Sequence, residues 1–395
     1  MKKKWVYKSC ILAMGILLGV SLTGCHLFFE KKAEEEKETE DILEVCRKTY
    51  EKAAKEHQCG DLEQLRSLME ALGEKGYISI DSENQINMTE YEKLLQFCEK
   101  VDTKKTGSAT VVEVAKEGSC IIRNLETENG TVNILRSYYI YQDGEMKQSS
   151  EDRYQAGSWE YTEDGYLMFS GWLAFDGSYE VTRNARMEYT AYRVLPLDET
   201  CREWNRKYIL PIGYACNNLF LIDWSEEEFG DLDFYDIFDL FYRENHAGNG
   251  TFTSGNAMGT SAVYLIAKEK FEQVIMSKFH ICSEVLQSKT VYHPEEAAYE
   301  YKPRGLEEAE YPEYPYPEVI GYEWNADGTL TLEVQAVFPS KGISKVYVHA
   351  VTVRETADGG VQYVANHILE PIQDPELRWH VPRLTRMEWE ELYGK

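Results

Sequence analysis

The residue whose surroundings most clearly indicate chemistry is Cys25. The chain opens with consecutive lysines at residues 2–4, runs apolar over residues 11–20 and then reaches Gly24 and Cys25. A cationic start, an apolar stretch of about 10 residues and a small residue before the cut are typical of a secretory signal. The apolar stretch is shorter than the roughly 20 residues of a membrane span. We therefore expect residues 1–24 to be an export signal that is removed in front of Cys25.

The end of this signal, Leu22-Thr23-Gly24-Cys25, resembles the lipobox of bacterial lipoproteins. The resemblance implies that the Cys25 thiol is acylated and that cleavage falls between Gly24 and Cys25. At least two acyl chains are then attached, and two chains anchor a protein stably where one binds only marginally. We expect lipid attachment at Cys25 and a location on the outer face of the cytoplasmic membrane. An ordinary secreted protein and an uncleaved N-terminal anchor are the alternatives.

The charged residues of the chain indicate how the segment after Cys25 and the folded body behave near a membrane. Residues 25–40 are mostly Glu and Lys after the first few positions, so they are expected to form a solvated tether. The whole chain has 42 basic and 68 acidic residues, a net charge of −26. Beyond the expected signal, the sequence contains no cluster of Lys and Arg, which argues against nucleic acid as a partner. The negative body should also be repelled by anionic lipids, so the acyl chains on Cys25 are the expected membrane contact.

Nine cysteines are present, of which Cys10 belongs to the signal and Cys25 to the anchor. The remaining seven are irregularly spaced and include no C-x-x-C pair, which predicts neither a disulfide framework nor a zinc site. Apolar neighbours favour small core residues, and a bond from Cys46 to Cys59, or from either to Cys98, stays open. The seven are Cys46, Cys59, Cys98, Cys120, Cys201, Cys216 and Cys282.

Two further segments have the residue spacing of a ligand-binding motif but lack residues that the motif requires. Gly250–Gly255 has the G-x-x-x-x-G spacing of a phosphate loop without the lysine that follows it. Asp231, Asp233, Asp236 and Asp239 suggest calcium, but an EF-hand counted from Asp231 lacks its Gly and its Glu. These acids are expected on the solvated face of an amphipathic helix.

Histidines and aromatic residues supply the last candidates. His349 and His367 are expected to form a surface pair across a hairpin rather than a metal site. Exposed rings on the strands could stack on sugars, although strand packing is the default; these are Trp159, Tyr161, Trp172 and Tyr179. With no H-E-x-x-H and no G-x-S-x-G in the sequence, no catalytic residue, metal ligand or cofactor site is assigned.

The periodicity of the chain predicts an α+β fold. Helical spacing dominates residues 41–102, and an antiparallel meander is expected over 107–196, where Asn129-Gly130 and Asp143-Gly144 are typical hairpin turns. Residues 197–309 are mixed and complete a body over 41–309. A Tyr/Pro-rich surface connector from residue 310 should then lead into a smaller β-rich part that ends at 395.

The C-terminal part resembles uncharacterised lipoproteins of clostridial gut anaerobes, over Glu272–Phe279, Leu286–Lys289, Asp327–Leu332 and Val361–Asn366. The resemblance implies a Gram-positive type of envelope and transfers no catalytic residue. We expect a non-enzymatic surface module that binds a cell-envelope glycan, a peptide or a partner protein. The alternatives are an extracytoplasmic hydrolase of glycan or peptide, and a solute receptor for a transporter. The receptor is disfavoured because no alternating βα pattern is present.

Overall fold

A computed structural model describes residues 33–55, 60–173, 186–245, 263–309, 313–374 and 376–394. The chain divides into two compact units. The first unit comprises residues 1–156 and 172–186, and the second comprises residues 157–171 and 187–395. The Gly250–Gly255 loop, Tyr179 and Cys59 lie outside the described residues.

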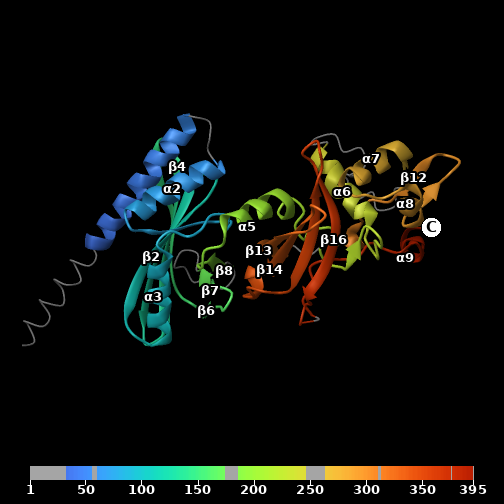
Figure 1. Cartoon of the computed structure of the whole chain (residues 1–395). Helices are drawn as coiled ribbons and strands as arrows, with labels where there is room; N and C mark the ends of the chain where they lie inside the picture. Colours follow the sequence, from blue (N-terminus) through green and yellow to red (C-terminus); the bar gives the residue numbers. More distant parts are fainter. Residues whose placement is uncertain are drawn as a thin grey trace, which may run out of the picture. The chain divides into compact units, whose positions relative to one another are not determined.

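The first unit is a five-stranded sheet with helices packed on it (Figure 1). The strands run in the order β1-β2-β3-β4-β5, parallel between β1 and β2 and antiparallel elsewhere. Its elements are the helix over residues 33–55, α2 (Leu62–Glu74), β1 (Ile78–Asp81), α3 (Tyr91–Asp102), β2 (Gly107–Val114), β3 (Ser119–Glu128), β4 (Thr131–Gln142) and β5 (Glu145–Gln155).

Two hairpins connect the strands of this sheet as the turn residues predict. Asn129 and Gly130 have φ of 54° and 82°, and Asp143 and Gly144 have φ of 57° and 84°. Positive φ at both central residues matches the right-handed twist of the flanking strands, and Asn-Gly and Asp-Gly adopt it readily. The predicted antiparallel meander is confirmed over residues 107–155. Its predicted continuation to residue 196 is wrong, because the described strands between residues 158 and 193 pair in a separate three-stranded sheet.

The first helix begins earlier than the sequence suggests. Residues 33–40, expected to belong to the solvated tether, are helical and continuous with residues 41–55. Ala, Glu and Lys are among the best helix formers, so a charged run of this composition continues a helix that is packed at its far end. Ile42, Cys46 and Tyr50 bury the apolar stripe of this helix in the core of the first unit.

The second unit contains three sheets and most of the aromatic core. The strand orders are β6-β7-β8, β10-β12-β11 and β13-β14-β15-β16-β9. Its elements are β6 (Ser158–Tyr161), β7 (Tyr166–Leu173), β8 (Arg186–Arg193), α5 (Glu199–Trp204), a π-helical turn (Asn205–Ile209), β9 (Trp224–Ser225), α6 (Phe234–Asn245), β10 (Tyr264–Ala267), α7 (Lys268–Lys278), α8 (Ser283–Ser288), β11 (Tyr292–His293), β12 (Ala298–Tyr301), short 3-10 turns (Leu306–Glu308 and Pro339–Lys341), β13 (Tyr316–Trp324), β14 (Leu330–Val337), β15 (Val348–Glu355), β16 (Val361–Glu370) and α9 (Arg386–Tyr393).

The Tyr/Pro-rich segment is part of a sheet and not a surface connector. Tyr316–Trp324 forms β13, which pairs with β14 at the edge of its sheet. An edge strand tolerates proline because one row of its N–H groups has no partner strand, and Pro317 lies in this strand. Residues 197–309 and 310–395 therefore share one core, to which Phe238, Phe271 and Val334 all contribute. The two compact units are divided near residues 156 and 186 and not at residue 310.

The described residues confirm the α+β class, with helices packed against mainly antiparallel sheets. Within these ranges, no helix combines the length and the apolar composition required to cross a membrane.

Candidate functional site

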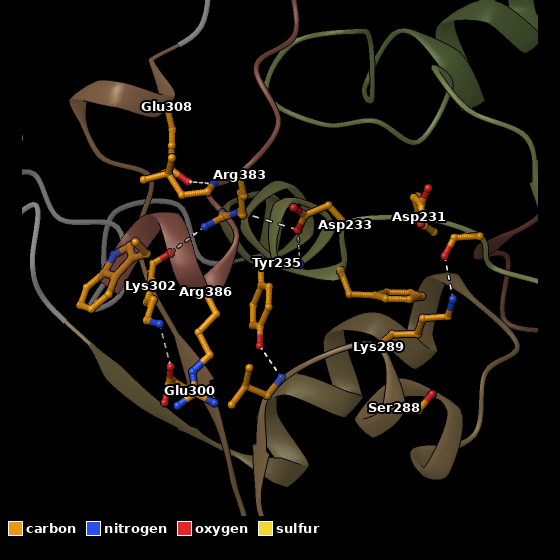
Figure 2. Close-up of a pocket in the computed structure, with 16 residues that line it drawn as sticks. Asp231, Asp233, Tyr235, Ser288, Lys289, Glu300, Lys302, Glu308, Arg383 and Arg386 are labelled. Atoms are coloured by element: carbon orange, nitrogen blue, oxygen red, sulfur yellow. Dashed lines mark hydrogen bonds and ion pairs between the residues drawn. The ribbon is translucent and has the colours of Figure 1, made fainter. Parts of the chain in front are cut away.

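The pocket chosen as the candidate site lies entirely within the second unit and has a volume of about 460 Å³ (Figure 2). That volume falls in the range of small-ligand sites. The start of α6, the end of α8, β12 and the segment leading into α9 form its walls. The lining residues are Gly230, Asp231, Leu232, Asp233, Phe234, Tyr235, Ser288, Lys289, Val291, Glu300, Lys302, Glu308, Arg383, Leu384, Arg386 and Trp389.

A network of buried charges underlies this pocket. Arg383 donates to Asp236 through Nε at 2.6 Å and to Asp239 through Nη2 at 2.6 Å. Arg304 donates to both oxygens of Asp236, at 2.9 Å and 2.5 Å. The Asp236 side chain is only 1% exposed, so its charge requires these partners. The network fixes the segment before α9 against α6 and makes the floor rigid.

The upper wall at the start of α6 is set by a helix cap. The Asp233 side chain accepts hydrogen bonds from the backbone N–H groups of Tyr235 and Asp236, at 2.9 Å and 3.0 Å. Asp at this position satisfies N–H groups that have no partner inside the helix. Tyr235 in turn accepts the N–H of Val291 at 2.8 Å, which joins α6 to the strand region on the other side of the pocket.

The pocket rim carries charges of both signs (Figure 2). Lys302 donates to Glu300 at 3.0 Å, and its ammonium lies 4.2 Å from the Trp389 ring centre. Arg386 pairs with Glu390 at 2.8 Å in an exposed i,i+4 contact, a kind that is individually weak. Across the pocket, Lys289 donates to the Gly230 carbonyl. The described residues include no ion pair of Lys289, which leaves its charge available to a ligand.

The titration properties of the lining groups follow from burial and pairing. Burial and the neighbouring Asp236 carboxylate raise the pKa of Asp233. Burial raises the pKa of Tyr235 to about 12. Burial also opposes ionisation of Glu300, but hydrogen bonds from Lys302 and His293 outweigh it and lower the pKa of Glu300. The Ser288 hydroxyl donates to the carbonyl of Val285 in its own helix. Glu300 is therefore stabilised as a carboxylate, whereas burial opposes the ionisation of Asp233 and of Tyr235.

One family covers nearly the whole of both units. DUF6070, described as a family of unknown function, matches residues 32–383. The chain belongs to the DUF6070 family. No curated protein and no solved structure matches it. The expectation of an uncharacterised family is confirmed at that level, and the DUF6070 match includes α6, β12 and Arg383 of the pocket while transferring no activity to them.

The acids of this DUF6070 member lie in a different environment from the one expected. Asp236 is buried, Asp233 and Asp239 are half-buried, and only Asp231 is exposed. The prediction that these acids lie on a solvated helix face is therefore wrong for Asp236 and Asp239. Arg304 and Arg383, from segments later in the chain, neutralise their charges. The described residues contain no group of three or more His, Cys, Asp or Glu suited to a metal ion.

The two histidines do not face each other. His349 pairs with Ile368 and His367 pairs with Ala350 across β15 and β16, which places their side chains on opposite faces of the sheet. His349 is fully buried and hydrogen-bonds to Tyr214 and Asn366. His367 is exposed, 3.8 Å from Asp223. The predicted surface pair is wrong, because the register offset by one residue inverts the side-chain direction.

The aromatic and cysteine candidates are distributed over the molecule. The Trp159 ring packs on Phe169 at 5.4 Å, as strand packing requires, and Tyr161 is half-buried. Trp172 is 57% exposed. Among the described cysteines, four are buried and two are exposed; the buried ones are Cys46, Cys98, Cys120 and Cys201, and the exposed ones are Cys216 and Cys282.

Sequence reasoning missed Arg383, Lys302 and Trp389 as lining residues of the pocket, and Arg304 as a residue of the charge network beneath it. Each is unremarkable in its local sequence, and they meet only through the pairing of distant segments. One local pattern does occur at this pocket, because Thr385-Arg386-Met387-Glu388 has the Thr and Glu spacing of a capping box. Its capping box is present at the start of α9, with Thr385 accepting the Glu388 N–H at 3.3 Å.

Proposed function

We propose that this chain is a lipid-anchored binding module on the outer face of the cytoplasmic membrane, and that the pocket of the second unit binds a short peptide carrying charges of both signs. The anchor is Cys25, acylated before the signal that ends at Gly24 is removed. Binding, and not catalysis, is the role assigned to the pocket.

The observation that carries the ligand assignment is the rim of the pocket. Acids outnumber bases in the chain by 68 to 42, yet the rim acids Asp231 and Glu300 are matched by three bases, which are Lys289, Lys302 and Arg386. A peptide offers an ammonium and a carboxylate to such a surface, and Trp389 and Tyr235 offer apolar walls. A neutral glycan has no charge to exchange with these pairs.

The rim pairs favour exchange with a ligand. Arg386 is 74% exposed in its pair with Glu390, and such contacts contribute little on their own. A ligand carboxylate can therefore replace Glu390 at small cost. Arg383 and Asp236 are buried in the floor and keep the rim residues in place.

Isothermal titration of the full chain in detergent, against a panel of short charged peptides and neutral oligosaccharides, tests the ligand class. We expect peptide binding, weakened about 10-fold or more by Trp389→Ala and by Lys289→Gln, or at least about 1.4 kcal/mol each. Lys341→Gln serves as the control, because Lys341 is an exposed lysine of the same unit that does not line the pocket.

Three outcomes would contradict the ligand assignment. Binding of oligosaccharides alone would replace the peptide by a glycan. Turnover of any panel member would replace the binding module by a hydrolase. Equal loss of binding in Lys341→Gln and Lys289→Gln would remove the pocket from the interaction.

The anchor is tested separately. Cells grown with radiolabelled palmitate should yield a labelled protein in the membrane fraction, and Cys25→Ala should abolish both the label and the membrane association. An unlabelled wild-type protein that fractionates like Cys25→Ala would refute the anchor without bearing on the pocket.

A further inference from the structure

Two cysteines from distant parts of the sequence meet in the core of the first unit. Cys46 lies in the helix over residues 33–55 and Cys120 lies in β3. Both side chains are 0% exposed and belong to the same hydrophobic cluster. Their thiols are in hydrogen-bond contact with each other. None of the bonds left open by the sequence, Cys46–Cys59 or either of these to Cys98, involves Cys120.

The surrounding contacts position the two thiols independently. Tyr50 follows Cys46 by one helical turn, on the same face of the helix. Its hydroxyl donates to the Ser119 carbonyl at 2.9 Å and approaches the Ala115 carbonyl at 3.3 Å. Ser119 immediately precedes Cys120. The helix is therefore fastened to the start of β3 at the residue beside Cys120, and this contact holds Cys46 over it.

The strand is equally constrained on its side. Cys120 pairs with Val114 of β2 and with Tyr139 of β4. Because strands on both sides are paired with β3 at Cys120, this residue has little freedom to move away from the helix over residues 33–55. Helix and strand are thus both held in the arrangement in which the two thiols are in contact.

We propose that Cys46 and Cys120 form a disulfide when the chain reaches the oxidising side of the membrane. The inference rests on the extracytoplasmic location proposed above, since disulfides form and persist in exported proteins. The two S–H bonds break and one S–S bond forms. The two electrons and two protons pass to the oxidant, a protein or small-molecule disulfide, which is reduced to two thiols.

The bond would join the anchor to the sheet. The helix over residues 33–55 is the first described element after Cys25, and β3 is the central strand of its sheet. A force applied through the lipid anchor would then reach the sheet through a covalent link and not through packing alone. The link would also close a loop of more than 70 residues, which restricts the unfolded chain strongly.

The full chain is purified reduced and equilibrated in a buffer of reduced and oxidised glutathione. It is then trapped with N-ethylmaleimide under denaturing conditions and digested for peptide mapping without reduction. We expect one peptide pair linked through Cys46 and Cys120, and a thermal midpoint of the first unit raised on the order of 10 °C over the reduced protein.

Cys98→Ala is the matched control, because Cys98 is a buried cysteine of the same unit on α3. It should keep both the linked pair and the redox-dependent midpoint, whereas Cys46→Ala and Cys120→Ala should each lose both. Alkylation of Cys46 and Cys120 in the equilibrated wild-type protein, or linkage of either to another cysteine, would overturn the proposal. Because this assay uses purified protein, its result is independent of the palmitate test of the anchor.

Discussion

His349 makes the stability of the second unit depend on pH. The imidazole is fully buried in β15, with Nε2 at 2.9 Å from the Tyr214 hydroxyl and Nδ1 at 2.7 Å from the Asn366 side-chain oxygen. Burial opposes the charged form and lowers the pKa of His349 from 6.5 to about 4, although the hydrogen bond with Asn366 acts in the opposite direction.

The sign and size of the effect follow from linkage. Between pH 6.5 and pH 4 the unfolded chain binds a proton that native His349 does not, so the free energy of unfolding falls as the pH is lowered. A shift of one pKa unit corresponds to about 1.36 kcal/mol, so the full loss is about 3 kcal/mol. Above pH 6.5, His349 is neutral in both the folded and the unfolded chain and contributes no pH dependence to the free energy of unfolding.

Urea unfolding at steps from pH 7 to pH 4 measures this loss. Trp224 and Trp379 are buried in the same core as His349 and report its unfolding by fluorescence. His349→Gln should remove about 3 kcal/mol of the wild-type pH dependence, whatever its effect at pH 7. His367→Gln, an exposed position on the neighbouring strand, should retain the wild-type dependence. Equal pH dependence in wild type and His349→Gln would refute the reasoning, as would an imidazole that titrates near 6.5 by NMR in the native protein.

Two further substitutions test the floor of the pocket and one turn. Arg383→Met should lower the free energy of unfolding of the second unit by about 3–5 kcal/mol, because it leaves Asp236 with a buried charge and one partner fewer. Adding Asp236→Asn should recover part of that loss, and no recovery would contradict a charge effect. Gly165→Ala should cost about 1–3 kcal/mol more than Gly328→Ala in the same urea assay. Both glycines have φ of +84°, but only at Gly165 would the new Cβ meet a side chain, Leu195 at 2.6 Å; equal costs would exclude the clash.

Local sequence signals predicted the elements whose cause is local. Asn129-Gly130 and Asp143-Gly144 fix their own backbone, so both hairpins could be located without any knowledge of the rest of the chain. The start of α9 also has a local cause, because Thr385 and Glu388 satisfy each other's backbone groups. The strand Tyr316–Trp324 was missed because the prolines at residues 312, 315 and 317 indicate a connector unless the strand is known to lie at an edge.

The candidate site could not be predicted because its partners are remote in sequence. Asp236 looked solvated from its own helix, and the two arginines that neutralise it lie 68 and 147 residues away. The sequence predicted that His349 pairs with His367 on the surface. Alternation of side chains along two strands shows which residues share a face only when the register between the strands is known. Charge burial and register are both properties of the tertiary fold.

Strand β9 has a consequence for how the second unit is made. The Asn366 side chain donates to the Ile222 carbonyl at 2.7 Å across 144 residues of sequence, and Ser225 pairs with Ala365 in β16. A ribosome adding about 5–20 residues per second needs roughly 7 to 30 s to cover that distance. Throughout this interval the newly made Trp224 has no sheet to join, so its segment is exposed to chaperones before folding can enclose it.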